Sequence, residues 1–256
     1  MSFDSIVAQG SSVSHCERAM QPLLIIATRN AHKSKEIQAI LGEGFKIRTL
    51  AEYADAPVVT EDAPTFAGNA IKKALGLARW LAAGQMAAVG GSIAFSVLAD
   101  DSGLEVDALG GAPGVRSARF AALDNGQVEN SSDADNNAKL LRLLRDVPVG
   151  KRTARFRCVI ALTPVIGIAR SLASPVCYAD ELELQTQVFE GVCEGKIGSI
   201  EKGKGGFGYD PLFIPKGFEQ TYAELSENKK NQISHRSKAL AKLAQHLLCH
   251  QGKQEP

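Results

Sequence analysis

The chain has 256 residues, of which 45% are hydrophobic and 22% are charged, and its formal net charge at pH 7 is +1. This composition is typical of a globular protein with one large domain or two lobes that share a cleft. Because the net charge is near zero, a general polyanion-binding protein is disfavoured, and an anionic ligand would need a local cluster of Lys and Arg.

Residues 1–21 are polar, lack the apolar segment of a secretory signal, and are predicted to be a disordered extension. No apolar run approaches the roughly 18 residues that a membrane span needs, which argues against a membrane protein. The five cysteines are scattered and show no C-x-x-C spacing. This pattern argues against a zinc site or a disulfide framework and favours reduced thiols and a cytoplasmic location.

From residue 22 onward, strand-like apolar runs alternate with helix-like patterns. The predicted elements, in chain order, are a strand over 23–27, a helix over 33–41, a strand over 45–50, a helix over 65–83, a loop within 84–95, a strand over 96–99, a helix over 134–144, strands over 154–162 and 182–193, and a helix over 237–248. The alternation predicts one α/β domain over 22–256, and the later pair of strands predicts a mixed sheet.

The first candidate site is the segment 28–35, Thr-Arg-Asn-Ala-His-Lys-Ser-Lys, where the first strand passes into the first helix. Backbone N–H groups at a helix N-terminus attract phosphate, and Lys33 would add a point charge. The alternative is an ordinary helix cap followed by solvated lysines. Spacing alone leaves the two interpretations equal, because this is not a Walker A loop.

The second candidate site is the pair Asp100-Asp101, which is predicted to end the apolar strand over 96–99. Carboxylates at the carboxyl edge of an α/β sheet lie where ligands usually bind. Adjacent residues of a strand point to opposite faces, so only one of the two acids should face a cleft. An acidic turn is the alternative, but burying two carboxylates without partners is costly, which favours a functional role.

A further acidic pair, Glu61-Asp62, precedes the predicted helix over 65–83. Acids before a helix commonly complement its dipole, and taken by itself this pair has that meaning. A role as a second metal carboxylate opposite Asp101 depends on the other motifs.

Two later segments carry possible base-binding groups. The segment 203–211, Gly-Lys-Gly-Gly-Phe-Gly-Tyr-Asp-Pro, combines glycines with aromatic rings on which a base can stack. The segment 229–237 holds Lys230, His235 and Arg236, whose donors suit base carbonyls or phosphate. The alternatives are a glycine-rich hairpin and a solvated basic face with a helix cap.

These segments occur together and in a fixed order with specific residues. The motifs are Ala27-Thr28-x-Asn30-x-x-Lys33, Thr65-Phe66-x-x-Asn69-Ala70, Ala99-Asp100-Asp101-Ser102-Gly103-Leu104, Gly110-Gly111-Ala112-Pro113-Gly114-Val115, Gly205-Gly206-Phe207-Gly208-Tyr209-Asp210-Pro211 and Ile233-Ser234-His235-Arg236. From about residue 23 to 248 the chain therefore resembles the inosine/xanthosine triphosphate pyrophosphatase family.

The resemblance implies an α/β fold with a long central mixed sheet flanked by helices and two lobes with a substrate cleft between them. It also implies a homodimer that uses Mg²⁺ to cleave non-standard purine nucleoside triphosphates (ITP, dITP, XTP) to the monophosphate and pyrophosphate. Asp101 would be the catalytic acid and a metal ligand together with Glu61, with Asp62 as the alternative to Glu61. The implied substrate-binding residues are Thr28, Arg29, Asn30, Ala31, His32, Lys33, Ser102, Phe207, Gly208, Tyr209, Asp210, Lys230, His235 and Arg236.

The chain departs from the family pattern at Arg29, where a small residue is usual, and in longer segments over 1–21, 82–95 and 166–180. One alternative function is a Maf-type pyrophosphatase for modified nucleotides, which should lack the Phe-Gly-Tyr-Asp and Ser-His-Arg motifs. Another is a non-catalytic nucleotide sensor, which has no need for both Glu61 and Asp101. Neither nucleic acid nor membrane is expected as a partner.

Overall fold

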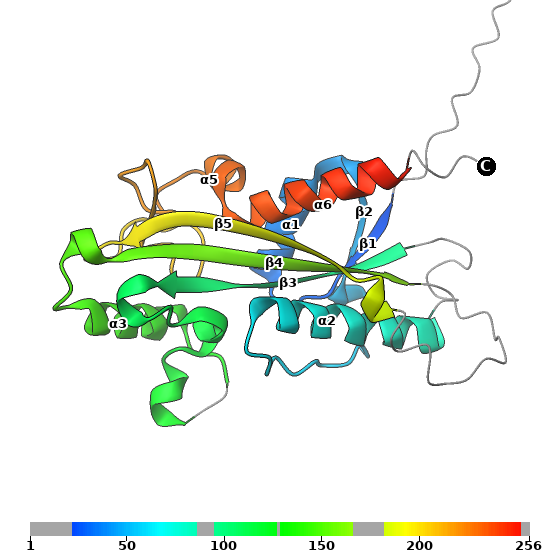
Figure 1. The fold of residues 1–256 in the computed structure, drawn as a ribbon, viewed down its shortest axis with the longest axis horizontal. Helices are drawn as coiled ribbons and strands as arrows, with labels where there is room; N and C mark the ends of the chain where they lie inside the picture. Colours follow the sequence, from blue (N-terminus) through cyan, green and yellow to red (C-terminus); the bar gives the residue numbers. More distant parts are fainter. Residues whose placement is uncertain (1–21, 86–94, 127–128, 166–181, 252–256) are drawn as a thin grey trace, which may run out of the picture.

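The computed structural model describes residues 22–85, 95–126, 129–165 and 182–251 (Figure 1). The predicted extension over 1–21, most of the predicted loop over 84–95 and the long segment over 166–180 lie outside the described residues.

The framework is a six-stranded mixed sheet with the strand order β2-β1-β3-β4-β5-β6. Strand β1 is parallel to β2 and β3, whereas the pairs β3–β4, β4–β5 and β5–β6 are antiparallel. The strands are β1 (Leu23–Ile26), β2 (Lys46–Thr49), β3 (Phe95–Val106), β4 (Thr153–Val165), β5 (Gln187–Ile197) and β6 (Phe213–Pro215). Because β3, β4 and β5 are much longer than β1, they extend past it and form the central platform of the molecule.

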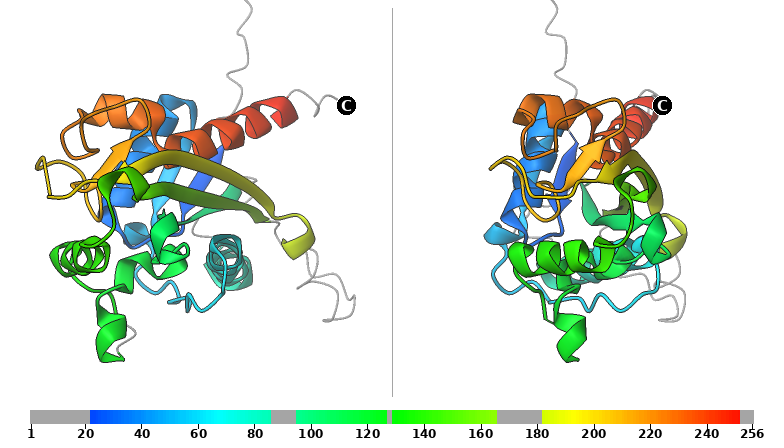
Figure 2. Two further views of the ribbon diagram at one scale, coloured as in Figure 1. Left: turned by 60° about the vertical axis from the view of Figure 1, so that its left-hand side comes forward. Right: turned by 90° about the vertical axis from the view of Figure 1, so that its left-hand side faces the viewer.

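Helices cover both faces of the sheet (Figures 1 and 2). Helices α1, α5 and α6 lie on one face, and α2 and α3 lie on the other. Their bounds are α1 (Ala31–Leu41), α2 (Phe66–Trp80), α3 (Asp133–Leu144), α5 (Glu227–Ile233) and α6 (His235–Gln251). The predicted fold class, a long mixed sheet flanked by helices, is confirmed.

The helix starts follow from local capping chemistry. Asn30, Thr65 and Ser132 each precede a helix, and the side chain of each accepts a hydrogen bond from a backbone N–H of the first turn. These bonds satisfy donors that have no partner within the helix. The predicted helices of these regions are therefore correct to within a few residues.

The prediction that a strand ends at the acidic pair is wrong. Strand β3 runs through Asp100 and Asp101 to Val106 and pairs with β4 over its whole length. The acids do not break the strand because each has partners on its own face of the sheet, as described below. They lie just beyond Leu98, the last β3 residue that pairs with β1, and so they still lie at the carboxyl end of the parallel part of the sheet.

The strand predicted over 182–193 also differs. Residues 182–184 form a helical turn, and β5 begins at Gln187. The hydroxyl of Thr186 donates to the carbonyl of Leu182 and so closes this turn locally. Strand β6 and helix α5, of three and seven residues, were not predicted as elements.

The hydrophobic core has three clusters, which follow the two faces and the two ends of the sheet. Two clusters lie on opposite faces of the end that carries β1, against α2 on one side and against α1 and α6 on the other. The third cluster lies at the far end, around Phe156, Phe213 and Tyr222. No helix in the described ranges is long and apolar enough to cross a membrane.

Candidate functional site

One cleft brings together nearly all of the residues that the sequence predicts to be functional. Its volume is about 610 Å³. Only Ala31 and His32 of the predicted site residues are absent from its lining, which includes Thr28, Arg29, Asn30, Lys33, Glu61, Asp101, Ser102, Phe207, Gly208, Tyr209, Asp210, Lys230, His235 and Arg236.

The segment 28–33, here called the phosphate loop, leads from β1 into α1. The Thr28 hydroxyl accepts a hydrogen bond from the Asn30 N–H at 3.2 Å, and the Asn30 side chain accepts one from the Lys33 N–H at 3.1 Å. The Lys33 ammonium lies 2.5 Å from an Asp100 carboxylate oxygen. The N–H groups of Asn30 and Lys33 are thus satisfied within the loop, and the Lys33 ammonium lies at the N-terminal end of α1.

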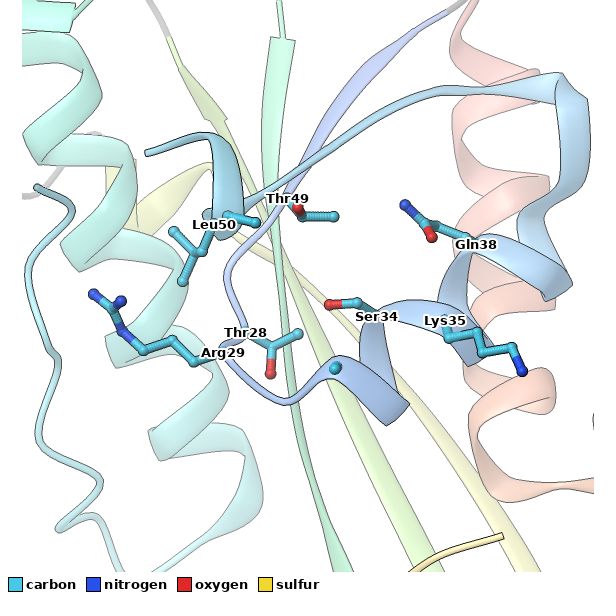
Figure 3. Close-up of a pocket in the computed structure, with 9 residues that line it drawn as sticks. Thr28, Arg29, Ser34, Lys35, Gln38, Thr49 and Leu50 are labelled. Carbon is cyan, nitrogen blue, oxygen red and sulfur yellow. The ribbon is translucent and has the colours of Figure 1, made fainter. Parts of the chain in front are cut away.

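A second cavity of about 470 Å³ lies on the outer side of the phosphate loop (Figure 3). Ala31 lines this cavity together with Ser34, Gln38 and Thr49, while Thr28 and Arg29 line both cavities. The loop is therefore a thin wall between the cleft and the outer cavity.

The two adjacent acids of β3 face opposite sides of the sheet, as the strand geometry predicts. The Asp100 carboxylate, 1% exposed, lies on the α1 and α6 face, where it pairs with Arg236 at 3.2 Å and with Lys33. Burial opposes its ionisation, but the charges of Arg236 and Lys33 outweigh burial and hold the pKa of Asp100 well below its usual range. Asp100 is thus a buried anion that orients two cations.

The Asp101 carboxylate lies on the α2 face and lines the cleft. It accepts hydrogen bonds from the Asn69 amide at 3.1 Å and from the Lys73 ammonium at 3.4 Å. Burial raises the pKa of Asp101, and the neighbouring Glu61 charge adds to the rise, whereas Lys73 and Lys33 only partly offset it. This carboxylate is therefore a better proton acceptor than an exposed aspartate.

The structure distinguishes between the two acids before α2. The Glu61 carboxylate accepts a hydrogen bond at 3.0 Å from Lys73, the residue that also donates to Asp101, and Glu61 lines the cleft. The Asp62 carboxylate instead pairs with Lys72 at the exposed surface. Glu61 and Asp101 thus converge on one ammonium group, and Asp62 does not take part.

Another part of the cleft lining, around Lys230 and Arg236, is built on buried ion pairs. The Lys230 ammonium donates to Asp210 at 2.6 Å and to Glu36 at 2.7 Å. The Arg236 guanidinium donates to Glu36, to Asp100 and to the Ser102 hydroxyl. Lys230 and Arg236 are 5% and 1% exposed. Burial lowers the pKa of Lys230, but Asp210 and Glu36 raise it more, so the ammonium group stays charged.

Aromatic rings line the same part of the cleft. The Lys230 ammonium lies 5.0 Å from the centroid of the Phe207 ring, and His32 stacks on Phe207 at a centroid distance of 5.4 Å. The His235 ring stacks on Phe156, and its buried Nδ1 has no hydrogen-bond partner in the described part of the chain. Burial and the charge of Arg236 hold the pKa of His235 well below its usual range, which keeps the ring neutral.

Several residues of the site were not predicted from the sequence. Asn69 and Lys73 come from one face of α2, and their i, i+4 spacing behind Thr65 was the available signal. Glu36 lies one helical turn after Lys33 on α1. The Arg119 guanidinium donates to the backbone carbonyl of Glu61. These four residues contact other site residues, and only the folded structure reveals those contacts.

Comparison with known proteins finds relatives that match most of the chain. The profile of the Ham1 family matches residues 24–246. A dITP/XTP pyrophosphatase of Desulforamulus reducens is 47% identical over 220 residues, which cover 86% of this chain and 92% of that protein. Another, of Geobacter sulfurreducens, is 43% identical over 226 residues, or 88% of this chain and 96% of that protein.

Solved structures show the same architecture. The Ham1 protein of Staphylococcus aureus superimposes with a TM-score of 0.67 at 34% identity, covering 89% of this chain and 99% of that chain. A HAM1 protein of Coxiella burnetii gives a TM-score of 0.66, also at 34% identity, and covers 89% of this chain and 98% of that chain. The sequence match over most of the chain and the shared fold show that the chain belongs to the Ham1 family.

Proposed function

We propose that this protein hydrolyses non-standard purine nucleoside triphosphates (ITP, dITP and XTP) to the monophosphate and pyrophosphate. The observation that carries the proposal is a single cleft with two chemically different ends. One set of lining residues, here called the base end, provides the cations and donors of Lys230 and Arg236 and the ring of Phe207. Another set, here called the phosphate end, consists of residues of the phosphate loop with Glu61 and Asp101. The names of the relatives, dITP/XTP pyrophosphatases, support the same substrate class.

The base end favours a purine with an oxo group at position 6. Lys230 and Arg236 are obligate donors, and both are buried. An oxo group can accept from such donors, whereas a 6-amino group would leave a buried donor without a partner. A lost partner of this kind costs far more than a change of shape, so the site should discriminate strongly against adenine.

The residues at the phosphate end fit Mg²⁺. Mg²⁺ prefers oxygen ligands and is often held by one or two carboxylates together with substrate phosphates. Glu61 and Asp101 converge on the Lys73 ammonium, so their charges already meet at a cation. The described residues contain no group of three or more potential metal ligands. When bound, Mg²⁺ would offset the charge that develops on the phosphate oxygens.

The chain's own residues account for the remaining steps. The N–H groups of the phosphate loop and Lys33 bind the β- and γ-phosphates. Asp101 accepts a proton from the water that attacks the α-phosphorus, and its raised pKa favours that role. Asn69 and Lys73 hold the Asp101 carboxylate in place by their hydrogen bonds. The water oxygen bonds to the α-phosphorus, the bond between the α-phosphorus and the oxygen that bridges it to the β-phosphorus breaks, and pyrophosphate leaves.

Product analysis tests this function. The wild-type protein is incubated with ITP, XTP, GTP or ATP plus Mg²⁺, beside Asp101→Asn, Glu61→Gln and Asp62→Asn. We expect pyrophosphate with IMP or XMP, little turnover of GTP and ATP, and a loss of about 10²–10⁴-fold for Asp101→Asn. Asp62→Asn is the matched control for Glu61→Gln and should keep full activity.

The other outcomes of this assay are equally clear. Release of single phosphate would place the attack at the γ-phosphorus and contradict the proposed geometry. Binding of ITP without turnover would favour a nucleotide sensor.

The resemblance also leads us to propose a homodimer in the cytoplasm. Light scattering of the purified protein tests the oligomeric state, and fractionation of cells that express it tests the location.

A further inference from the structure

Arg29 does not extend toward the other cations of the phosphate loop. Its Nη2 donates a hydrogen bond at 2.7 Å to the backbone carbonyl of Ala56. In the close-up view its guanidinium group points away from Ser34 and Gln38, which line the same outer cavity (Figure 3). This contact spans 27 positions of the sequence and joins the loop to a different part of the cleft wall.

On the side that faces the outer cavity, the phosphate loop has little side-chain packing. The outer cavity of about 470 Å³ lies on that side, so side-chain packing does not fix the loop there. The hydrogen bonds of the Thr28 and Asn30 side chains stay within the loop and the first turn of α1. They set the shape of the loop. The α1 end of the loop is held by the ion pair of Lys33 with Asp100 and by the stack of His32 on Phe207, whereas the Arg29 contact holds the end next to β1.

Ala56, by contrast, is a fixed point. It is 5% exposed and packs in the core on the α2 face together with Tyr53, and its N–H donates to the Tyr53 carbonyl. The same segment leads to Glu61. There the backbone is held again, because Arg119 donates to the Glu61 carbonyl and the Ala63 N–H donates to Asn69.

We propose that Arg29 is a positioning residue that latches the phosphate loop to the Ala56 carbonyl and so sets the loop at a fixed distance from Glu61 and Asp101. The catalytic consequence of this latch rests on the proposed function: phosphates bound by the loop are held at the correct position relative to the Glu61 and Asp101 carboxylates. A small residue at position 29 cannot make this contact, so the latch depends on the arginine of this chain.

Hydrogen exchange of the protein without nucleotide or metal tests the latch directly. We expect amides of residues 27–36 to exchange about fivefold faster in Arg29→Met, because the loss of one hydrogen bond favours local opening by about that factor. Lys35→Met is the matched control: it removes the same charge from the same stretch, but Lys35 pairs only with the exposed Glu227. It should exchange like the wild-type protein.

Kinetics distinguish a latch from a simple phosphate ligand. A latch predicts that kcat for ITP falls about fivefold in Arg29→Met while KM changes little, and that Arg29→Lys, which keeps a donor, restores part of both kcat and protection from exchange. Unchanged exchange with a raised KM would overturn the proposal and make Arg29 a phosphate ligand. If the wild-type protein does not turn over ITP, the proposed function fails, yet the exchange comparison still decides on the latch.

Discussion

The two ends of the cleft are built in opposite ways. At the base end, Lys230, Arg236 and Asp210 are at most 5% exposed and are fixed by long-range ion pairs. At the phosphate end, Arg29 and Asn30 are exposed, and the Glu61 side chain is 40% exposed.

This difference matches the task of each end. A buried network of ion pairs resists rearrangement, so the donors that face the base keep their positions and can reject a base that does not match them. The phosphate end has to admit a flexible, charged polyphosphate and an ion, and solvent access eases the entry of both. Selectivity is thus expected to depend on the rigid base end, and the entry of phosphate and metal on the exposed groups of the phosphate end.

Removing Arg236 should produce the largest effect on stability. Arg236→Met leaves the buried Asp100 and the partly buried Glu36 without the guanidinium, and we expect the free energy of unfolding to fall by about 3–5 kcal/mol. Arg155→Met is the control, because Arg155 pairs with partly exposed acids on β3 and β5 and should cost below about 1 kcal/mol. Urea unfolding measures both. Equal losses would mean that the base end is not the rigid end.

The pH dependence of stability should reveal the neutral His235. Burial and Arg236 hold the pKa of His235 well below 6.5 in the folded state. As the pH falls below about 6.5, the unfolded chain binds a proton that the folded protein does not. The free energy of unfolding therefore has its full value above about pH 6.5. As the pH drops from there toward the pKa of His235 in the folded protein, the free energy of unfolding falls by up to about 1.4 kcal/mol per pH unit.

In His235→Gln this part of the slope should disappear. Urea unfolding at pH 7.5, 6.5 and 5.5 measures the slope in both proteins. Identical slopes below pH 6.5 would contradict a neutral, buried imidazole at the base end.

The smallest effect is expected at the phosphate end, from Lys73. Its ammonium occupies the position between Glu61 and Asp101 where a cation would gain most. In Lys73→Met we expect Mg²⁺ to bind more tightly, and saturating Mg²⁺ to raise the free energy of unfolding by about 1 kcal/mol more than it does in the wild-type protein.

Thermal or urea unfolding with and without Mg²⁺ measures this gain. Lys72→Met is the control, since Lys72 is its neighbour on α2 and pairs with the outward-facing Asp62. If both variants respond to Mg²⁺ as the wild-type protein does, Glu61 and Asp101 do not form the metal position.

The sequence predicted the helices well because their signals are local. Asn30 and Thr65 cap α1 and α2, which begin within two residues of the starts predicted at 33 and 65. The end of β3 was predicted wrongly for a non-local reason. Two adjacent acids resemble a turn, and only cations from α1, α2 and α6, far apart in sequence, allow them to lie within a strand.

The motifs of the sequence determined the family, the class of fold and a set of site residues of which nearly all line the cleft, because these properties depend on residue types and short spacings. The tertiary structure alone decided which acid before α2 faces the cleft, and it alone placed Lys73 between two carboxylates, Glu36 between two cations and Arg29 on the Ala56 carbonyl. Contacts between segments separated by tens to hundreds of residues depend on how the chain packs, and no local pattern encodes the direction in which an individual side chain points.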